Sequence, residues 1–498
     1  MTPTKPAAGP PSPSGVRRGG DRFQDLFVWG AALQVVRPDS RYSQVEVEVK
    51  GVGNLDDVIL RSAVGGGAVF GQVKWATNAS EPLTENFLLD RTMRNGRPVS
   101  RSVLQKLFDS YRKVRGDGPA PPTLRLITNR ALDGAHALLG NVDGRTQLLV
   151  PHAAQAGPNT AAGRAVEAWA QHVDASREEL LEMLASLEFH SGRTIPAERD
   201  HVRALMIAAG LDDSDTALQH GLDIVAGWVV DGRRVVTAKD VNDAIDERGL
   251  RRADPSAILV VQSIDTDPHA DEATLALNWV DLFDGDQPRV RIQPRDPADW
   301  AHMDRELTEA AATLEAEGWT STLVRGAMRQ ATFFRVGAAL PAVRQHTLRY
   351  LQGGQLWSTD TPKTPVDAPR AHHTRLDLGS DLAVAVGVAV DPTDAVAAYL
   401  RSQSIPVREL VTVQPAAGAD DQAVANAGQA VAYAQQIRDL VRRQLDRGPG
   451  AERVHLFLAG PGGLALLLGH RWNRIRPTVV YEHLGPGRGY TPAFTIDA

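Results

Sequence analysis

The amino-terminal half is organised around one short apolar stretch, Ala68-Val69-Phe70-Gly71-Gln72-Val73-Lys74-Trp75. It follows the acidic pair Asp56-Asp57 and the glycine cluster at residues 65–67. An apolar run bounded by glycines is typical of a strand that leaves a hairpin turn. Side chains alternate between the two faces of a strand, so Gln72 and Lys74 point to the same side. The order predicts a carboxylate on one strand, a hairpin, and Gln-x-Lys on the next strand.

The flanking sequence predicts the other elements of this domain. A helix that begins at Asp21 would gather apolar residues on one face: Phe23, Leu26, Phe27, Gly30 and Leu33. Valines alternate with charged residues over 45–50 and predict a first strand, with a second over 57–60. Residues 102–114 predict another helix, and residues 124–128 a fourth strand. The resulting order is helix, three strands, helix, strand.

The residues around this strand are candidates for metal-assisted hydrolysis of a phosphodiester. Such chemistry uses a metal that polarises the phosphate and activates water, and Mg²⁺ (or Mn²⁺) prefers oxygen ligands. Asp57 is the candidate central ligand, and Gln72 a weaker one through its carbonyl oxygen. Glu48 is an additional candidate from the preceding strand, with Glu46 on the same face as an alternative. Lys74 would orient the attacking water or help to deprotonate it.

A purely structural interpretation stands beside the catalytic one. A Val-Glu-Val-Glu strand is usually a solvated face, and a lysine beside Trp75 is most often an exposed strand residue. Gln24 on the first helix is a candidate to approach the same cluster. A basic stretch near the second helix would either track phosphates or be a solvated helix face: Arg101, Lys106, Arg112, Lys113 and Arg115. The surroundings of the motif favour catalysis, because context is what confirms a short motif.

Length and composition bound the class of protein. The chain of 498 residues has room for about two to four domains. Its hydrophobic content of 43% and charged content of 23% are ordinary for a globular protein. The lack of cysteine excludes disulfides, cysteine-zinc sites and thiol nucleophiles, and it fits the cytoplasm. A net charge of -6 means that a nucleic-acid interface must be a local basic surface. No apolar run reaches membrane-spanning length.

Changes in pattern divide the chain into five segments. Residues 1–20 contain five prolines and predict a disordered tail. Residues 21–150 form the α/β domain around Gln-x-Lys, and residues 151–254 predict a helical connector. Strands and helices alternate again from residue 255. We therefore predict two successive Rossmann-like units, at 255–375 and 376–498.

The two predicted units carry stretches that resemble a known sensor family. The first stretch is Leu-Val-Arg-Gly-Ala-Met-Arg at 323–329, followed by glycines at 337, 353 and 354. The second is Val-His-Leu-Phe-Leu-Ala-Gly-Pro-Gly-Gly at 454–463, followed by 468–470, 480–482 and 490–494. Both resemble the SAVED domain. The resemblance implies two fused CARF-like Rossmann units that sense cyclic oligonucleotides.

The amino-terminal half resembles the double-stranded DNA endonuclease domain that is often fused to SAVED. The matching pieces are Phe23-Gln24, Val47-Glu48, residues 55–58 and Gln72-Val73-Lys74. The resemblance implies a restriction-endonuclease-like fold for this half. Over residues 20–498 the combination is similar to the nuclease effectors of bacterial CBASS anti-phage systems. It implies a nuclease that a cyclic oligonucleotide switches on through self-association, with double-stranded DNA as its substrate.

The candidate ligand residues lie where strands of the second half end. Arg329 and Gln330 follow one strand, Gln262 another, and Asp391 opens a helix as either a plain cap or a ribose contact. The glycine-rich loop is either a phosphate-binding turn or a tight structural turn: Gly460, Pro461, Gly462 and Gly463. An alternative function is a nucleotide-sensing regulator or DNA-binding protein whose nuclease fold is inactive.

Overall fold

The computed structural model describes residues 13–48, 55, 57–63, 65, 67–94, 97–98, 100–116, 120–447 and 450–497. Residues 1–12 of the predicted tail, Val49 of the predicted first strand and Asp56 of the acidic pair lie outside these ranges. The chain divides into two compact units, residues 1–255 and 256–498. The predicted boundary at 254/255 falls one residue from this division.

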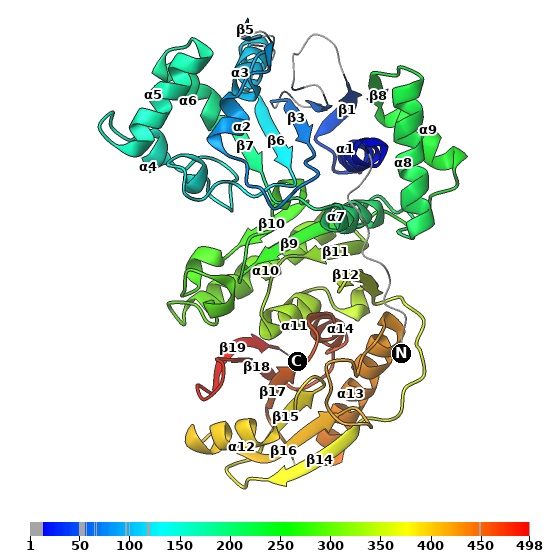
Figure 1. The fold of residues 1–498 in the computed structure, drawn as a ribbon. Helices are drawn as coiled ribbons and strands as arrows, with labels where there is room; N and C mark the ends of the chain where they lie inside the picture. The colour runs from blue at the N-terminus through cyan, green and yellow to red at the C-terminus, as the bar shows by residue number, and fades with distance from the viewer. Residues whose placement is uncertain are drawn as a thin grey trace, which may run out of the picture. The chain divides into compact units, whose positions relative to one another are not determined.

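The amino-terminal unit is built on a six-stranded sheet with the order β7-β6-β3-β2-β1-β8 (Figure 1). The central strands are β1 (Tyr42–Val47), β2 (Val58–Ser62), β3 (Val69–Lys74) and β6 (Thr123–Thr128). β1, β2 and β3 pair antiparallel as a meander, and β6 joins β3 in parallel after a helical crossover. The predicted order of helix, three strands, helix and strand is therefore present.

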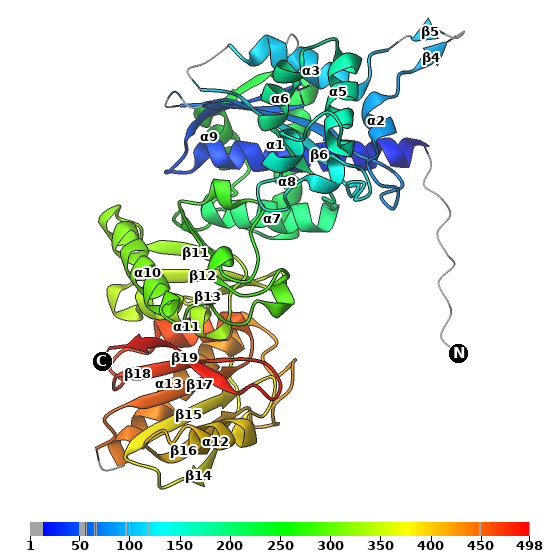
Figure 2. The same cartoon turned by 90° about the vertical axis from the view of Figure 1, so that its left-hand side faces the viewer.

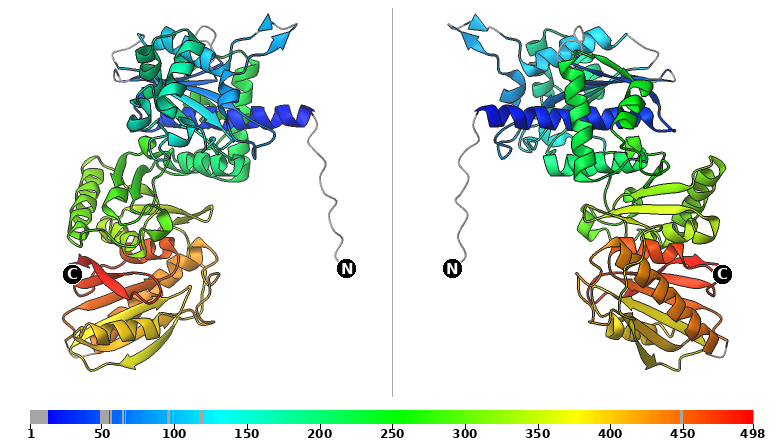
Figure 3. Two further views of the ribbon diagram at one scale, coloured as in Figure 1. Left: turned by 60° about the vertical axis from the view of Figure 1, so that its left-hand side comes forward. Right: turned by 90° about the vertical axis from the view of Figure 1, so that its right-hand side faces the viewer.

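Helices cover both faces of this sheet (Figure 3). On one face lie α3 (Val103–Val114), α5 (Ala161–Val173) and α6 (Arg177–Ala185), whose apolar residues share a core with β2, β3 and β6. The capping box of Ser102 and Gln105 fixes the start of α3. On the other face, Phe23 of α1 (Pro13–Val36) packs on Val73 and Ile127. Short pieces complete this part of the unit: α2 (Glu85–Leu89), β4 (Met93–Arg94), β5 (Arg97–Pro98) and α4 (Pro151–Ala154).

The first helix begins at Pro13 rather than at Asp21. Residues 13–20, predicted as part of the disordered tail, are therefore helical. Tertiary packing explains the difference, because Gly19 and Gly20 lie against the Trp75 side chain. A glycine pair is a poor helix former in isolation, so the sequence pattern favoured a later start.

Residues 151–254, predicted as a helical connector, also complete the amino-terminal sheet. β7 (Leu187–His190) pairs in parallel with β6, and β8 (Val235–Thr237) pairs antiparallel with β1. The helices α7 (Ile195–Ala208), α8 (Asp215–Val230) and α9 (Ala238–Glu247) pack on α1. The sequence indicates one short strand run in this segment, Arg234–Val236, which corresponds to β8. The four residues of β7 show too little alternation to be detected.

The carboxy-terminal unit contains two sheets (Figure 2). The first is five-stranded with the order β10-β9-β11-β12-β13, and the second is six-stranded with the order β14-β16-β15-β17-β18-β19. The strands of the first sheet are β9 (Ala257–Gln262), β10 (Leu275–Asn278), β11 (Ser321–Arg325), β12 (Thr347–Gln352) and β13 (Gln355–Ser358). Those of the second are β14 (Arg370–Arg375), β15 (Asp381–Gly387), β16 (Val407–Gln414), β17 (Val454–Ala459), β18 (Thr478–His483) and β19 (Tyr490–Ile496).

Each sheet has a parallel centre and at least one antiparallel edge strand. β10, β9, β11 and β12 are parallel, and so are β16, β15, β17 and β18. The helices between them are α10 (Asp299–Ala316), α11 (Gln330–Ala339), α12 (Thr393–Ser402), α13 (Ala427–Arg447) and α14 (Gly462–His470). One continuous apolar core contains residues of both sheets and of α10, α11, α13 and α14. This arrangement confirms the predicted α/β architecture of the second half.

The helices α11 and α14 cross at very close range. An added Cβ at Gly469 would lie 2.0 Å from the carbonyl oxygen of Phe334, and one at Gly337 would lie 2.1 Å from that of Leu466. Each helix therefore offers a glycine to the backbone of the other. This reciprocal contact holds the two halves of the carboxy-terminal unit together. Within the described part of the chain, no helix combines the length and the apolar character that crossing a membrane requires.

Candidate functional site

Three strand ends meet where the sequence predicts the catalytic site. Val47 of β1 pairs with Val58 of β2, and Val58 pairs with Gly71 of β3. The next position along each strand is Glu48, Asp57 and Gln72. The register alone therefore brings these three predicted residues to neighbouring positions on adjacent strands, toward one end of the meander.

Asp57 and Gln72 are in direct contact. The amide Nε2 of Gln72 donates to the Oδ2 atom of Asp57, and the backbone N–H of Val73 donates to the same oxygen at 2.7 Å. Gln72 is buried and Asp57 is half-buried. Two donors on one oxygen fix the carboxylate against β3.

Lys74 shares the strand face of Gln72. Phe70, two residues before Gln72, belongs to the core beneath α3, whereas Val73 packs on α1. Alternation along β3 therefore places Gln72 and Lys74 together on the face opposite α1. Gln24 lies on α1 itself, the helix that covers the other face, so the structure does not group it with Gln72 and Lys74.

The two candidate glutamates have different partners. Glu46 is buried and pairs with Arg61, whose Nε lies 2.8 Å from the glutamate Oε1. Glu48 follows the last residue of β1 with φ 46°, and its Oε2 lies 2.7 Å from Nη1 of Arg234. A left-handed glutamate is uncommon and such residues concentrate at functional sites. Glu46 is thus committed to an ion pair inside the sheet, and Glu48 turns out of the strand.

Asp25 on α1 is an acidic neighbour that the sequence pattern did not single out. Burial and, after it, the nearby charges of Asp21, Asp223 and Glu48 together raise its pKa to about 6. These carboxylates crowd one region beside the end of β1. The surrounding negative charge would favour a bound cation over a bound anion. An acidic residue on the first helix is visible in the sequence. That Asp25 lies near Glu48 depends on tertiary packing.

The basic stretch on α3 is mostly neutralised by acidic neighbours. Arg101 lies 2.8 Å from Asp109, and Arg112 lies 3.2 Å from Glu179. Arg115 lies 3.8 Å from both Glu179 and Glu182. These pairs fit the solvated-helix alternative better than a dedicated phosphate-binding surface.

In the carboxy-terminal unit, two predicted ligand residues meet. The Nε2 of Gln330, the first residue of α11, donates to the carbonyl oxygen of Gly460 at 2.5 Å. The backbone N–H of Gly463 donates to Oε1 of Gln352 at 2.9 Å. The two halves of the unit are therefore joined by hydrogen bonds at this loop.

The glycines of the loop serve this packing. A Cβ on Gly462 would lie 2.5 Å from the ring of Phe333, and one on Gly463 would lie 2.7 Å from Trp357. Pro461 precedes the first turn of α14 as its N-terminal cap residue. The close approach that the glycines permit is to the first half of the same carboxy-terminal unit, which fits the structural alternative for this loop.

Arg329 lies at the start of α11 beside a buried carboxylate. Its Nε donates to the carbonyl oxygen of Arg291 at 2.8 Å, and burial lowers its pKa while the charge of Glu482 raises it. Glu482, the penultimate residue of β18, accepts the backbone N–H of Ala331 at 2.9 Å. Sequence analysis predicted Arg329 as a ligand residue and gave no role to Glu482. In the sequence, Glu482 stands out as a carboxylate near the end of an apolar strand.

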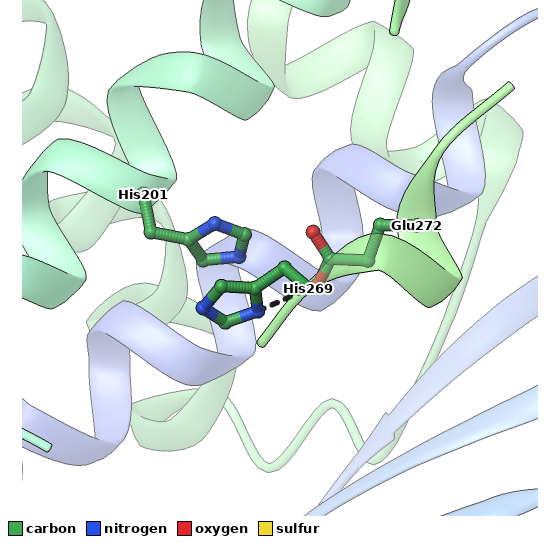
Figure 4. Close-up of side chains that lie close together, drawn as sticks. All are labelled: His201, His269 and Glu272. Atoms are coloured by element: carbon green, nitrogen blue, oxygen red, sulfur yellow. Dashed lines mark ion pairs between the residues drawn. The ribbon is translucent and has the colours of Figure 1, made fainter. Parts of the chain in front are cut away.

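Gln262 belongs to a separate polar network at the end of β9. Its Oε1 accepts the backbone N–H of Asp267 at 2.6 Å, and Arg325 donates to Asp267 at 2.9 Å. Nearby, Nδ1 of His269 lies 3.5 Å from Oε1 of Glu272 (Figure 4). These contacts hold the loop after β9 against the end of β11.

Asp391 has the contacts of a helix cap. Its Oδ1 accepts the backbone N–H of Thr393 at 2.9 Å and the Thr393 hydroxyl at 2.5 Å. The hydrogen bond from the Thr393 hydroxyl lowers the pKa of Asp391, and the bond from the Thr393 backbone N–H acts in the same direction. The geometry fits the capping alternative for this residue.

Comparison with known proteins identifies the sensor part of the chain. Residues 303–496 match the family model of SAVED, the SMODS-associated and fused to various effectors sensor domain. The chain is also 23% identical over 494 residues to CD-NTase-associated protein 4 of Enterobacter hormaechei subsp. hoffmannii (strain UCI 50). That alignment covers 93% of this chain and 95% of the relative.

Two receptors are among the solved structures that align with this chain. The Acinetobacter baumannii Cap4 SAVED/CARF-domain containing receptor with the cyclic trinucleotide 2'3'3'-cAAA aligns with a TM-score of 0.44 and 14% identity, over 96% of this chain and 99% of that chain. The Moraxella osloensis Cap4 SAVED/CARF-domain containing receptor aligns with a TM-score of 0.42 and 13% identity, over 96% and 100%. The family match is the firmer result: the carboxy-terminal unit contains a SAVED sensor domain.

Proposed function

We propose that this protein is a CBASS anti-phage effector, a metal-dependent endonuclease of double-stranded DNA that a cyclic oligonucleotide activates. The SAVED match and the similarity to CD-NTase-associated protein 4 support the sensing half of this proposal. The nuclease half rests on the residues of the amino-terminal unit. Its main support is the contact between Asp57 and Gln72, with Lys74 two residues further along the same strand face.

The residues at this site fit a divalent cation. Asp57 would be the central ligand, Gln72 would add its carbonyl oxygen after its amide turns over, and Glu48 would be the additional ligand. All three offer the hard oxygen donors that Mg²⁺ or Mn²⁺ prefers. The metal would supply polarisation of the scissile phosphate and activation of water. Lys74 would orient the water and stabilise negative charge that develops on the phosphate.

The ligand would bind at the surface where the two halves of the carboxy-terminal unit meet. Arg329 is the proposed phosphate contact, because it carries a positive charge at the start of α11. Gln330 and the loop of Gly460 form the adjoining surface. Gln262 and Asp391 would reach the ligand only after leaving their present hydrogen bonds. Binding would promote self-association, which brings nuclease domains together on duplex DNA.

Plasmid cleavage by the purified protein tests the proposal directly. The protein is incubated with Mg²⁺ and a panel of cyclic di- and trinucleotides that includes 2'3'3'-cAAA and 3'3'3'-cAAA. We expect cleavage with one or few ligands and none without ligand. Removing Mg²⁺ with a chelator is expected to abolish cleavage while binding of the cyclic nucleotide persists. Cleavage that is independent of every nucleotide would contradict the activation step.

A second candidate function is a nucleotide-sensing regulator with an inactive nuclease fold. It is favoured by one observation: Gln72 is neutral, and its amide nitrogen rather than its oxygen faces Asp57. A neutral ligand binds a divalent cation more weakly than a carboxylate. Ligand binding without cleavage of any DNA across the panel would support this second candidate.

Glu48 is expected to matter less than Asp57 for cleavage. Its carboxylate already pairs with Arg234 at 2.7 Å, so a metal would have to compete for it. We expect Glu48→Gln to retain cleavage within about tenfold, whereas Asp57→Asn loses about 10²-fold or more. Initial cleavage rates at saturating Mg²⁺ measure both effects. Equal losses in the two variants would place Glu48 among the primary ligands.

A further inference from the structure

The start of α11 is occupied by a carboxylate from the other sheet of the same unit. Glu482 on β18 is 3% exposed and accepts the N–H of Ala331 at 2.9 Å. The first N–H groups of a helix carry partial positive charge and favour an anion. The protein thus supplies its own anion to the helix end that bears Arg329 and Gln330.

The groups around Glu482 make its charge state adjustable. Arg329 faces it from the start of α11, His483 adjoins it on β18, and Tyr490 faces it from β19. Burial raises the pKa of Glu482 to about 7, against the lowering effect of the Ala331 N–H, Arg329 and the His483 N–H. Tyr490 has its pKa raised to about 12 and stays neutral near pH 7. Burial lowers the pKa of His483, with Arg329 acting in the same direction.

We propose that Glu482 is the positioning residue for ligand binding at Arg329, and that its carboxylate takes up a proton when the anionic ligand binds. The proposal rests on the proposed function, in which Arg329 contacts a ligand phosphate. A phosphate beside Arg329 brings a second negative charge close to Glu482. Two like charges in a buried site disfavour double ionisation, so one proton is bound from solvent. Protonated Glu482 keeps its carbonyl oxygen as an acceptor for Ala331, so α11 keeps its position.

The sign of the pH dependence follows from this linkage. Free Glu482 is protonated below about pH 7 and ionised above it. At low pH the carboxyl group of Glu482 is already neutral when the ligand binds. At high pH the carboxylate must first take up a proton. Affinity is therefore expected to fall as pH rises above about 7. His483 titrates below this window, because its pKa is lowered from the ordinary value.

The test is ligand binding by the full chain from pH 6 to pH 9, measured by calorimetry. The probe is the nucleotide that activates plasmid cleavage, or 3'3'3'-cAAA if none does. We expect wild-type affinity to fall about tenfold between pH 7 and pH 9, since one proton linked to binding changes affinity at most tenfold per pH unit. Glu482→Gln, which keeps an acceptor oxygen but cannot ionise, is expected to bind with little pH dependence.

Two control variants isolate the effect. Glu409→Gln removes a carboxylate of the same sheet that pairs with His373 at 2.8 Å, and it should keep the wild-type pH profile. His483→Gln should also keep the profile above pH 7. A pH profile that disappears in His483→Gln and persists in Glu482→Gln would overturn the role of Glu482.

Proton uptake gives a readout that needs no variant. Calorimetry of the wild-type protein at pH 8 in two buffers of different ionisation enthalpy reports protons bound with the ligand. We expect uptake of up to about one proton per ligand. Measurable binding with no proton uptake would overturn this inference and leave the proposed function standing. No binding of any probe at any pH would remove the proposed function and this inference together.

Discussion

Lys74→Ala is expected to lower DNA cleavage by about 10²–10⁴-fold, the usual contribution of a positioned acid–base group. The alternation of β3 places Lys74 on the face of Gln72, and Gln72 and Val73 hold the Asp57 carboxylate in place. Removal of its ammonium group takes away the positive charge that β3 itself contributes to this face. We expect the rate of the chemical step to fall, with nucleotide binding by the carboxy-terminal unit unchanged.

Lys239→Ala is the matched control for this experiment. Lys239 lies in the same unit, is exposed, and pairs with Asp243 at 2.5 Å. Its removal is expected to leave cleavage within about twofold of the wild-type rate, because an exposed ion pair contributes little to stability. Initial rates of plasmid nicking and linearisation under the activating nucleotide provide the measurement. Full activity in Lys74→Ala would place the active site elsewhere in the chain.

Gly469→Ala is expected to destabilise the carboxy-terminal unit by about 3 kcal/mol, a large value for one methyl group. The new Cβ would lie 2.0 Å from the carbonyl oxygen of Phe334 and 3.1 Å from the backbone nitrogen of Ala338. Both neighbours are helix backbone, which cannot move aside as a flexible side chain can. The helices α11 and α14 would have to separate, and the core that they share with both sheets would loosen.

Thermal unfolding followed by circular dichroism measures this effect. A loss of this size corresponds to a midpoint about 6–12 °C lower for a unit of this length. Gly227→Ala in α8 is the control, because nothing lies within 4 Å of its added Cβ. That variant is expected to be neutral or slightly stabilised, as for helical glycine-to-alanine changes in open space. An unchanged midpoint in Gly469→Ala would mean that the helix crossing relaxes without cost.

The elements that sequence analysis placed well are those with strong local signals. The alternating valines predicted β1, which begins at Tyr42 rather than at Val45, and the apolar face of residues 102–114 predicted α3, whose observed start is Val103. The strand predicted over residues 124–128 is β6, which spans Thr123–Thr128. In each case the periodicity of burial repeats within a single element, so one stretch of chain carries the whole signal.

The elements that were missed depend on distant partners. β7 is short, and it exists because an edge of the amino-terminal sheet pairs with it. The first helix extends back to Pro13 because its glycines pack on Trp75. No local pattern encodes such contacts, since the partner residues are far away in the chain.

By itself, the sequence determined the strand order of the amino-terminal meander and hence the grouping of Asp57, Gln72 and Lys74. A two-residue strand period and a hairpin leave little freedom for these side chains. Only the tertiary structure decided which partner each carboxylate has, as Glu46 has Arg61. It also decided that Glu482 caps the helix of Arg329, across 151 residues of chain. Such pairings depend on burial and charge contacts made after folding, and no local periodicity records them.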